Sequence, residues 1–477
     1  MGKYPHSGEP RPDLKQVPAF IESIAKGWED VPRPADVPPS AAEAAASHRV
    51  RLGEVLRERF GSRAAVVFSG HAPIRNNDCY YEFRADSSFL WLLGASIEFA
   101  CVIVQADGTA ALYLKPPARP GDIDFFGSAA YGELWVGPSA GLNEWAEALG
   151  VAVRDYAELP DALTKLSNPL VSGTVHSSEV ADFGLISTPE LDMELSHLKM
   201  FKDDWEIAQL QLAVDLSVGG FEAVAEAIPQ AIGLERGERW LQGTFDRHAR
   251  TYGNGPGYAS IVGSGKHAPT LHWVRCDGPI IEQMPLLLDM GVEARSGYTA
   301  DVTRTIPPTG KFSEAGKAVH DLVETAHRAG LAAAKAGANY LDFHYAAMEV
   351  LANGLHDWGL LPVSVDEALS PNGQQHRRYI VCGIGHHLGL DVHDCSKADN
   401  RMYEGNTFQP GMVFTVEPGL YFHEIDLTVP PELRGIGVRI EDDVLIQADG
   451  SQKVLSAALP ITAAGLEEWT AARLRTL

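Results

Sequence analysis

The feature that most constrains the fold of this 477-residue chain is a set of acidic residues inside apolar runs of its C-terminal half. Asp289 interrupts PLLLDMGV, Asp301 interrupts YTADVTRTI, Glu417 follows MVFTV, and Glu441 follows GVRI. Burying an ionised carboxylate in such surroundings is costly unless a partner compensates the charge. A fold that buries four carboxylates on four strands therefore has to bring them to a common cation.

Strand alternation assigns these side chains to faces. Asp301, Thr303 and Thr305 share one face of their run, and Arg439 and Glu441 share a face of theirs. Taken singly, each acidic residue has an ordinary explanation, such as a strand end, a turn or half of an ion pair. Their joint occurrence at successive runs of one domain indicates a metal cluster.

The segment GIGHHLGLDVHD contributes His386, His387 and His393, which supply an imidazole ligand and nearby proton-transfer groups. Oxygen-rich sites with one nitrogen suit hard or borderline divalent ions such as manganese. Bridging carboxylates hold two such ions about 3.5–4 Å apart, and a water between them becomes a nucleophile near neutral pH. The predicted reaction class is hydrolysis.

Local signals divide the chain into a tail and two domains. The proline-rich residues 1–39 are predicted to form a surface tail, residues 40–190 an α/β domain, and residues 195–470 a second domain. The run AAEAAASHRVRLGEVLRERF is a predicted helix between Ser40 as N-cap and Gly61. The later apolar runs are typical of strands: AAVVFSG, FLWLLGA, FACVIVQ, AALYLKP and GELWVGP.

Helix signals are clearer in the second domain. Asp203 and Glu206 form a D-x-x-E start for a long amphipathic helix. Further helices are predicted at 313–336, beginning at Ser313, and at about 341–358. Four strand-like runs lie between and after them: PLLLDMGV, YTADVTRTI, MVFTVEPG and GIGVRIEDDVLI.

Composition bounds the partners and the compartment. The chain has 63 acidic and 39 basic residues, a net charge of −24, which would repel nucleic-acid phosphates and anionic membranes. No run approaches the ~20 apolar residues of a membrane helix, and the N-terminus has no apolar h-region. We therefore expect a cytoplasmic protein with no nucleic-acid or membrane partner and with its five cysteines reduced.

Five motifs, from about residue 195 to 465, resemble the signature of the pita-bread metallopeptidases: LLLDMG, YTADVTRT, GHHLGLDVHD, TVEPGLY and GVRIEDD. Further segments are similar to the aminopeptidase P branch: SIVGSG, TLHW, VPPELRGIGVRIEDD and, in the N-terminal domain, RNNDCYYEFRADSSFLWLLGA. The resemblance implies an α/β N-terminal domain followed by an α+β pita-bread catalytic domain.

The resemblance also implies a set of site residues. A dinuclear site for two divalent ions, most often manganese in that family, would have five ligands, with Asp301 and Glu441 bridging: Asp289, Asp301, His386, Glu417 and Glu441. The catalytic residues implied are Glu417, which takes the proton of the attacking water, Arg439, which orients the ligands, and His272 and His393. These two histidines, with Tyr258 and Cys382, are the implied substrate-binding residues.

The activity implied is that of an Xaa-Pro aminopeptidase, which removes the N-terminal residue from peptides with proline in the second position. Members of the family form homodimers or homotetramers, and Asp78 and Arg84 match the segment that reaches a neighbouring active site. A proline-cleaving enzyme needs a dedicated pocket because the proline nitrogen carries no N–H and its ring fixes φ.

Two departures from the family pattern stand out. The interval from Asp289 to Asp301 is 301 − 289 = 12, one residue longer than expected, which the turn in VEARSGYTA absorbs. Cys382-Gly383 stands where the family has histidine-glycine. Either turnover is reduced or the substrate altered, or Cys382 is a small buried hydrophobe. Two alternatives to the aminopeptidase stay open, a prolidase that cuts only Xaa-Pro dipeptides and a catalytically weakened binding homologue.

Overall fold

Two units make up the structure, Met1–Asp192 and Met193–Leu477. It is a computed structural model that describes residues 12–173 and 183–474. The division falls close to the predicted end of the α/β domain, and each unit has apolar clusters of its own.

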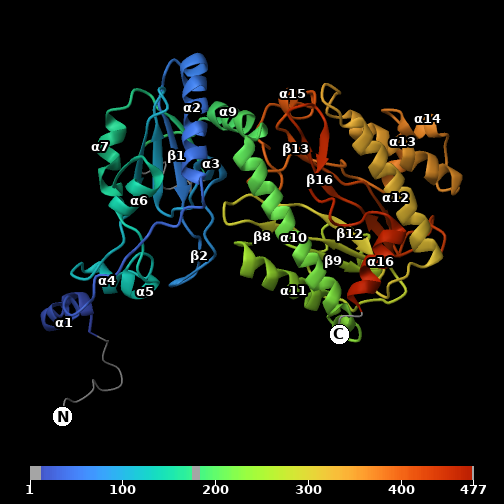
Figure 1. The fold of residues 1–477 in the computed structure, drawn as a ribbon, viewed down its shortest axis with the longest axis horizontal. Coiled ribbons are helices and arrows are strands. Elements are labelled where there is room, and N and C mark those ends of the chain that lie inside the picture. The colour runs from blue at the N-terminus through green and yellow to red at the C-terminus, as the bar shows by residue number, and fades with distance from the viewer. Residues whose placement is uncertain (1–11, 174–182, 475–477) are drawn as a thin grey trace, which may run out of the picture. The chain divides into compact units, whose positions relative to one another are not determined.

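The N-terminal unit is built on one five-stranded sheet in the order β6-β5-β4-β1-β7. The β1–β4 and β4–β5 pairs are antiparallel, whereas β1–β7 and β5–β6 are parallel. Figure 1 shows α2 and α7 on opposite sides of this sheet. The bounds of the principal elements are β1 Ala65–Gly70, β4 Ala100–Val104, β5 Ala110–Leu114, β6 Ala152–Asp155, β7 Leu170–Gly173, α2 Ala41–Phe60, α6 Leu142–Leu149 and α7 Leu159–Thr164.

Two of the predicted strands in this unit are wrong. FLWLLGA lies largely in α3, Ser87–Leu93, whose N-cap Asp86 accepts hydrogen bonds from the next backbone N–H groups. GELWVGP contains α5, Glu133–Val136. A short continuous apolar run does not distinguish a strand from a buried helix. The helix α2 is confirmed with Gly61 at its end, but Ser40 has a φ of 58° and makes no side-chain cap.

The proline-rich segment contains ordered structure within its described part. The helix α1, Pro18–Ile24, precedes an irregular stretch, and Phe20 packs edge-on against Phe126 at 5.0 Å between ring centroids. Arg33 is buried, and its Nε donates to Glu133 Oε1 at 2.7 Å. This segment therefore lies on the N-terminal unit and is anchored there by a buried ion pair.

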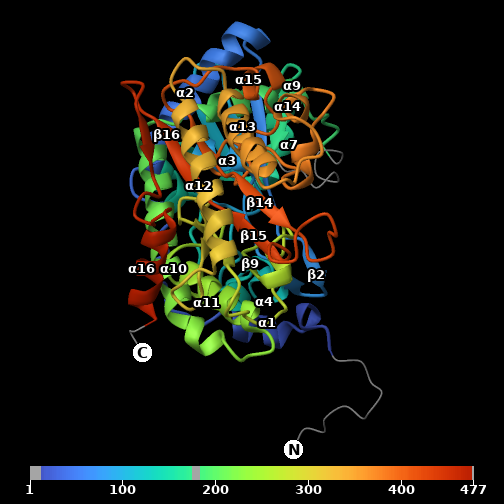
Figure 2. The ribbon, with the colours of Figure 1, turned by 90° about the vertical axis from the view of Figure 1, so that its right-hand side faces the viewer.

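The predicted helices of the C-terminal unit are confirmed. The N-cap Asp203 forms a capping box with Glu206 at the start of α10, Asp204–Ala231. Ser313 caps α12, Glu314–Ala333, which packs along α13, Asp342–Asp357, as Figures 1 and 2 both show. The remaining long helices are α9 Pro189–Met200, α11 Gly237–Tyr252 and α16 Ala463–Arg473.

Four small sheets carry the strand-like runs of this unit. Their orders are β12-β10-β9, β11-β8, β13-β16-β17 and β14-β15. A backbone bridge between Thr303 and Glu441 joins the first sheet to the segment between β15 and β16. The bounds are β8 Gly255–Pro256, β9 Ile261–Ser264, β10 Leu286–Asp289, β11 Val292–Glu293, β12 Thr303–Ile306, β13 Val413–Val416, β14 Gly419–Phe422, β15 Ile436–Arg439, β16 Asp442–Ile446 and β17 Gln452–Val454.

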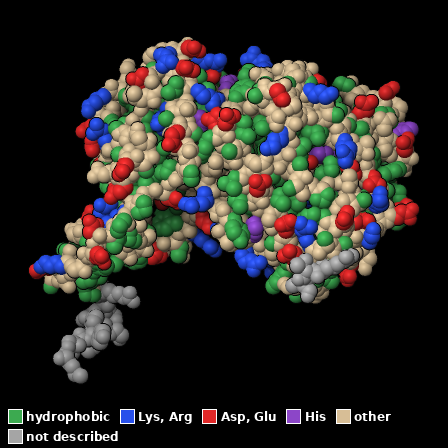
Figure 3. Space-filling model, in the orientation of Figure 1, with side chains coloured by type: hydrophobic (Ala, Val, Ile, Leu, Met, Phe, Trp, Pro, Cys, Tyr) green, Lys and Arg blue, Asp and Glu red, His purple; other side chains and the backbone are tan. Residues whose placement is uncertain are grey.

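The surface and the helices give two further observations. Acidic and basic side chains are interspersed over the face that Figure 3 shows. Across the described part of the chain, no helix combines the length with the apolar character needed to cross a membrane.

Candidate active site

A cavity of about 750 Å3 in the C-terminal unit brings together the ten residues predicted as metal ligands or as catalytic or substrate-binding residues. Its lining includes both groups of predicted residues, the five metal ligands and the residues assigned to catalysis or substrate binding: Asp289, Asp301, His386, Glu417, Glu441, His272, His393, Arg439, Tyr258 and Cys382. The structure thus places them in one cavity, while their individual roles remain predictions.

The predicted carboxylate ligands lie at strand ends, not in strand interiors. Asp289 is the last residue of β10, and Asp301 precedes β12 by two positions. Glu417 directly follows β13, and Glu441 falls between β15 and β16. The prediction of four carboxylates on four strands therefore holds for Asp289, whereas the other three lie next to strands. Where ladder pairing stops, the backbone can turn and aim the side chains at a shared point.

His386 lies at the centre of this group. Its Nε2 is 3.3 Å from Asp301 Oδ2 and 3.5 Å from Glu417 Oε1. Asp301, His386 and Glu441 each offer one ligand atom within 4.8 Å of the others. Three donors this close, with two more carboxylates lining the same cavity, make up a donor set that suits divalent cations.

Glycine explains how the segment carrying His386 reaches this position. Thr415 Oγ1 in β13 accepts from the His386 N–H at 3.1 Å, and the Thr415 N–H donates to the His386 carbonyl at 2.9 Å. A Cβ at Gly385 would lie 2.1 Å from the Thr415 carbonyl oxygen. Only glycine allows so close an approach of the two backbones.

A hydrogen-bonded layer surrounds the carboxylates. Tyr258 donates its hydroxyl proton to Asp289 Oδ1 at 2.6 Å, and Thr303 Oγ1 donates to Glu441 Oε2 at 2.6 Å. Arg439 is paired with the other oxygen of Asp289. Its Nε also donates to Thr303 Oγ1 at 3.1 Å. Partners of this kind orient metal ligands and fix which oxygen faces the cation.

Two members of this layer were missed by the sequence reasoning. Arg439 Nη1 donates to the hydroxyl of Tyr421 at 2.9 Å, and the backbone N–H of Asp301 donates to Asp443 Oδ2 at 3.1 Å. Asp443 is fully buried, and its other oxygen has no hydrogen-bond partner among the described residues. A signal was present, because Asp443 is one more acidic residue in an apolar run, IEDDVLI.

The electrostatics of the cavity show an excess of buried negative charge. Burial raises the pKa of Glu417 to about 7, although His386 opposes the shift. Burial, reinforced by Asp301, raises the pKa of Glu441 well above its ordinary value, and burial also raises the pKa of Asp289. Burial alone would lower the pKa of His386, but Asp301 and Glu417 outweigh it and raise the value to about 9. Bound cations would relieve this repulsion.

The three histidines of the GHHLGLDVHD motif have different environments. The ring of His393 packs edge-on against His386 at 4.3 Å, and burial lowers its pKa. His387 lies outside the cavity lining, fully buried and stacked on Tyr340 at 4.8 Å. Its predicted part in proton transfer is therefore not supported. His272, from another segment, is exposed and lines the cavity.

Cys382 lies in the cavity wall and is only half-buried. Burial, with Glu417 nearby, raises the pKa of its thiol, so the group is neutral near pH 7. The interpretation of Cys382 as a buried hydrophobe is thus incomplete, because the thiol borders the space where a substrate would lie. Asp78 and Arg84 belong to the N-terminal unit, where both are exposed.

Comparison with known families gives two matches that together cover most of the chain. The model of metallopeptidase family M24 matches residues 208–448, and that of the aminopeptidase P N-terminal domain matches residues 46–175. The first match contains all ten predicted site residues.

Individual relatives are similar over nearly their full length. Xaa-Pro aminopeptidase 1 of Streptomyces coelicolor is 42% identical over 461 residues, which span 95% of this chain and 92% of that protein. Xaa-Pro aminopeptidase of Escherichia coli is 28% identical over 445 residues, 86% of this chain and 96% of that one.

Solved structures show the same architecture. Aminopeptidase PepP of Pseudomonas aeruginosa superposes with a TM-score of 0.79 at 26% identity, covering 91% of this chain and 98% of that one. Aminopeptidase P of Escherichia coli with the inhibitor Pro-Leu gives a TM-score of 0.77 at 26% identity, with the same coverage. The expected pairing of an α/β N-terminal domain with a pita-bread domain is confirmed.

Proposed function

The chain belongs to metallopeptidase family M24 and is a metal-dependent aminopeptidase that removes the residue in front of a proline, and we propose that it works with two divalent ions. The proposed ligands are the five that the sequence singled out: Asp289, Asp301, His386, Glu417 and Glu441. The observation that carries this proposal is their convergence on one cavity with His272, His393 and Arg439.

The donor set fits divalent cations. Four carboxylates and one imidazole suit an ion of the manganese class, and manganese is the ion we propose. Two such ions at these ligands would acidify the attacking water and polarise the carbonyl of the scissile peptide bond. The fit is supported by the raised pKa values of Asp289, Glu417 and Glu441. These values show that nearby positive groups do not fully compensate the burial of the three carboxylates.

Glu417 is proposed to accept the proton of the attacking water. Burial raises the pKa of Glu417 to about 7 in the metal-free chain, and a cation bound beside it would favour the ionised form, which is the form that can accept a proton. Thr415 Oγ1 approaches Glu417 Oε1 at 3.5 Å and helps to hold the carboxylate at the edge of β13.

Arg439 is proposed as the positioning residue of the site. It is almost fully buried and contacts Asp289, Thr303 and the Tyr421 hydroxyl, and Thr303 in turn contacts Glu441. One guanidinium thereby fixes two of the proposed ligands at once, since its planar donors have a set geometry.

The remaining lining residues suit a short peptide substrate. His272, His393 and Tyr258 offer polar contacts, while Ile261, Leu271 and Val274 form an apolar part of the wall. A proline ring has an apolar surface and a nitrogen without a hydrogen, so it needs apolar contact and no acceptor at that position. We propose that His272 and His393 contact the substrate and stabilise the charge that develops on its carbonyl oxygen.

Oligomeric state and compartment are further parts of the proposal. We propose a homodimer or homotetramer in which Asp78 and Arg84 approach a neighbouring active site, in a cytoplasmic protein. The exposure of both side chains is compatible with such a contact. The strong negative charge argues against nucleic acid as a partner.

The test is hydrolysis by the purified, manganese-loaded protein. The proposal expects release of alanine from Ala-Pro-Ala, slower cleavage of the dipeptide Ala-Pro, and little cleavage of Ala-Ala-Ala. The Glu417→Gln variant should lose the activity, whereas Glu424→Gln, which changes an exposed glutamate, should retain it. Cleavage of the dipeptide alone would identify a prolidase. Two bound ions without any cleavage would favour the binding homologue.

A further inference from the structure

The loop at 265–277 of the C-terminal unit supplies three residues to the wall of the cavity, Leu271, His272 and Val274. Within the described chain, the 3-10 turn Gly265–His267 is the one regular element of this loop. The His272 side chain is exposed, and its imidazole makes no hydrogen bond with any described residue. The position of His272 therefore depends on whatever holds the loop.

The carboxylate of Glu238, the second residue of α11, holds this loop at four points. It is fully buried. Its Oε1 accepts from the Ser264 N–H at 2.9 Å and from His267 Nδ1 at 2.8 Å. Its Oε2 accepts from Trp273 Nε1 at 2.9 Å and from the Gly278 N–H at 2.8 Å. Ser264 and Gly278 flank the loop, so one side chain fastens both of its ends and two residues between them.

Trp273 connects this anchor to His272, which directly precedes it in the chain. The indole is only 8% exposed and stacks on the His267 ring at 3.9 Å between centroids. The Arg275 guanidinium lies over it at 4.2 Å from the ring centroid. A side chain held by a hydrogen bond and by two ring contacts leaves the backbone of its neighbour His272 little freedom.

The four donors require a carboxylate at this position. An ionised glutamate only accepts hydrogen bonds, and its two oxygens together offer about four acceptor sites. Each Glu238 oxygen accepts from two N–H groups. Glutamine would turn its own NH2 group toward two of these donors in either orientation of the amide, and buried donors left without an acceptor are costly. Glutamine is therefore expected to release part of the loop.

We propose that Glu238 is a positioning residue that acts on the substrate through His272. This inference rests on the proposed function, in which His272 contacts the substrate and stabilises the charge on its carbonyl oxygen. Glu238 does not line the cavity. Its loss displaces the His272 imidazole and leaves the metal ligands in place. A displacement of about 1 Å in such a group can cost on the order of 100-fold in rate.

The kinetic test is a double-mutant cycle on the full, manganese-loaded chain with Ala-Pro-Ala as substrate. Glu238→Gln should lower kcat/KM at least about tenfold, with the bound metal unchanged. In the His272→Ala background, Glu238→Gln should lower it no further, because the group through which Glu238 acts is gone. An equal loss in both backgrounds overturns the proposal. So does an unchanged kcat/KM or a loss of bound metal in Glu238→Gln.

Trp273→Phe is the milder variant and decides the question where Glu238→Gln does not fold. It removes one of the four donors and keeps an aromatic ring against His267. The expected result is a loss of kcat/KM of a few-fold that disappears in the His272→Ala background. A loss of the same size in both backgrounds contradicts action through His272, and no loss at all contradicts the anchoring by Glu238.

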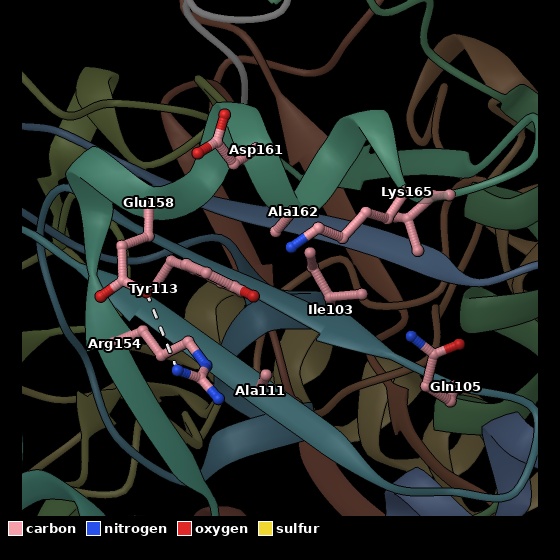
Figure 4. A pocket seen from close by; sticks show the side chains of 10 residues that line it. Ile103, Gln105, Ala111, Tyr113, Arg154, Glu158, Asp161, Ala162 and Lys165 are labelled. Atoms are coloured by element: carbon pink, nitrogen blue, oxygen red, sulfur yellow. Dashed lines mark ion pairs between the residues drawn. The ribbon is translucent and has the colours of Figure 1, made fainter.

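Two glutamates of the N-terminal unit are matched controls for the change of charge. Glu133 is buried and accepts from Arg33 Nε at 2.7 Å and from Arg33 Nη2 at 3.0 Å. Glu158 is about half exposed and pairs with Arg154 at 3.7 Å (Figure 4). Glu133→Gln and Glu158→Gln should keep the wild-type kcat/KM. A loss in Glu133→Gln as large as that in Glu238→Gln would overturn the proposal, because any buried glutamate would then have the same effect.

Crystal structures of Glu238→Gln and Trp273→Phe separate a failure of this inference from a failure of the proposed function. The expected result is a displacement of the His272 Cα by about 1 Å in Glu238→Gln, with the five proposed metal ligands in their wild-type positions. An unchanged loop in both variants overturns the positioning role even if the wild type cleaves Ala-Pro-Ala. If the wild type does not cleave it, the proposed function fails, and a displaced His272 still supports the anchoring of the loop by Glu238.

Discussion

Each buried carboxylate in the cavity lowers the stability of the folded protein when no metal is bound. Glu441 is buried in the field of Asp301 and Glu417, and His386 and Arg439 are the positive groups that act on Glu417. Because burial dominates, both carboxylates have raised pKa values. Each therefore favours the protonated form in the folded, metal-free protein, and metal binding has to displace those protons.

This predicts how Glu417→Gln changes the stability of metal-free protein with pH. The folded pKa of about 7 lies above the unfolded one near 4.3, so the wild type loses stability as pH rises from about 4.3 to 7. Glutamine carries no charge and avoids that loss. In chelator-treated protein, the variant should melt slightly above the wild type at pH 5 and several degrees above it at pH 8. The limiting gain is on the order of 3 kcal/mol.

Manganese-loaded protein is the control for this prediction, because bound cations remove the penalty and the variant should then lose its advantage. The account of Glu417 would be contradicted if metal-free Glu417→Gln melted below the wild type at pH 8, or if the difference were the same at pH 5.

Cys382 predicts a gain of activity. Its neutral thiol is a weak hydrogen-bond donor in the cavity wall, and a histidine there would offer two ring nitrogens to the substrate or to a proton relay. Cys382→His is expected to raise kcat/KM for an Xaa-Pro peptide about tenfold, equivalent to ~1.4 kcal/mol of transition-state stabilisation. Cys382→Ala serves as the size control. If Xaa-Pro hydrolysis does not rise in Cys382→His, the thiol does not limit turnover and the prediction is wrong.

At the level of helices and strands, the sequence predicted which segments carry the site but not how they end. Asp289, Asp301, Glu417 and Glu441 were recognisable because charge interrupted apolar runs. Alternation alone could not show that pairing stops at these residues, since strand ends depend on the partner strand. The bridge between Thr303 and Glu441 is such a long-range contact, and the sequence around either residue does not predict it.

The helix predictions succeeded where caps and periodicity agreed and failed where an apolar run stood alone. Asp203 and Ser313 were correctly placed at helix starts. FLWLLGA was mistaken for a strand although Asp86 before it and Gly94 after it are cap residues of α3. These two cap residues were visible in the sequence, and as helix signals they outweigh the β-propensity of the run.

Capping predicts a contrast between two substitutions. Asp203→Ala removes the side chain that accepts from the Glu206 N–H, and should cost about 1 kcal/mol, or about 2–4 °C in Tm. Ser40→Ala should leave Tm within about 1 °C, because Ser40 makes no cap at α2. Differential scanning calorimetry measures both. Equal losses in the two variants would contradict the assignment of the caps.

For the molecule as a whole, the division into two units leaves every lining residue of the proposed metal site in the C-terminal unit. The sequence analysis placed a domain boundary near residue 190 from composition and helix signals, whereas the oligomer is proposed from family resemblance. Light scattering should give a mass of about two or four times the 51.6 kDa of one chain. A monomer at micromolar concentration would remove the proposed contribution of Asp78 and Arg84 to a neighbouring site.

The number of divalent ions bound per chain tests the central claim most directly. Elemental analysis of protein saturated with manganese and freed of excess metal should find two ions in the wild type and in the surface control Glu424→Gln. Glu441→Ala, which removes the proposed bridging carboxylate, should hold one ion or none. Wild-type protein without bound ions, or Glu441→Ala with a full complement of two, would contradict the account.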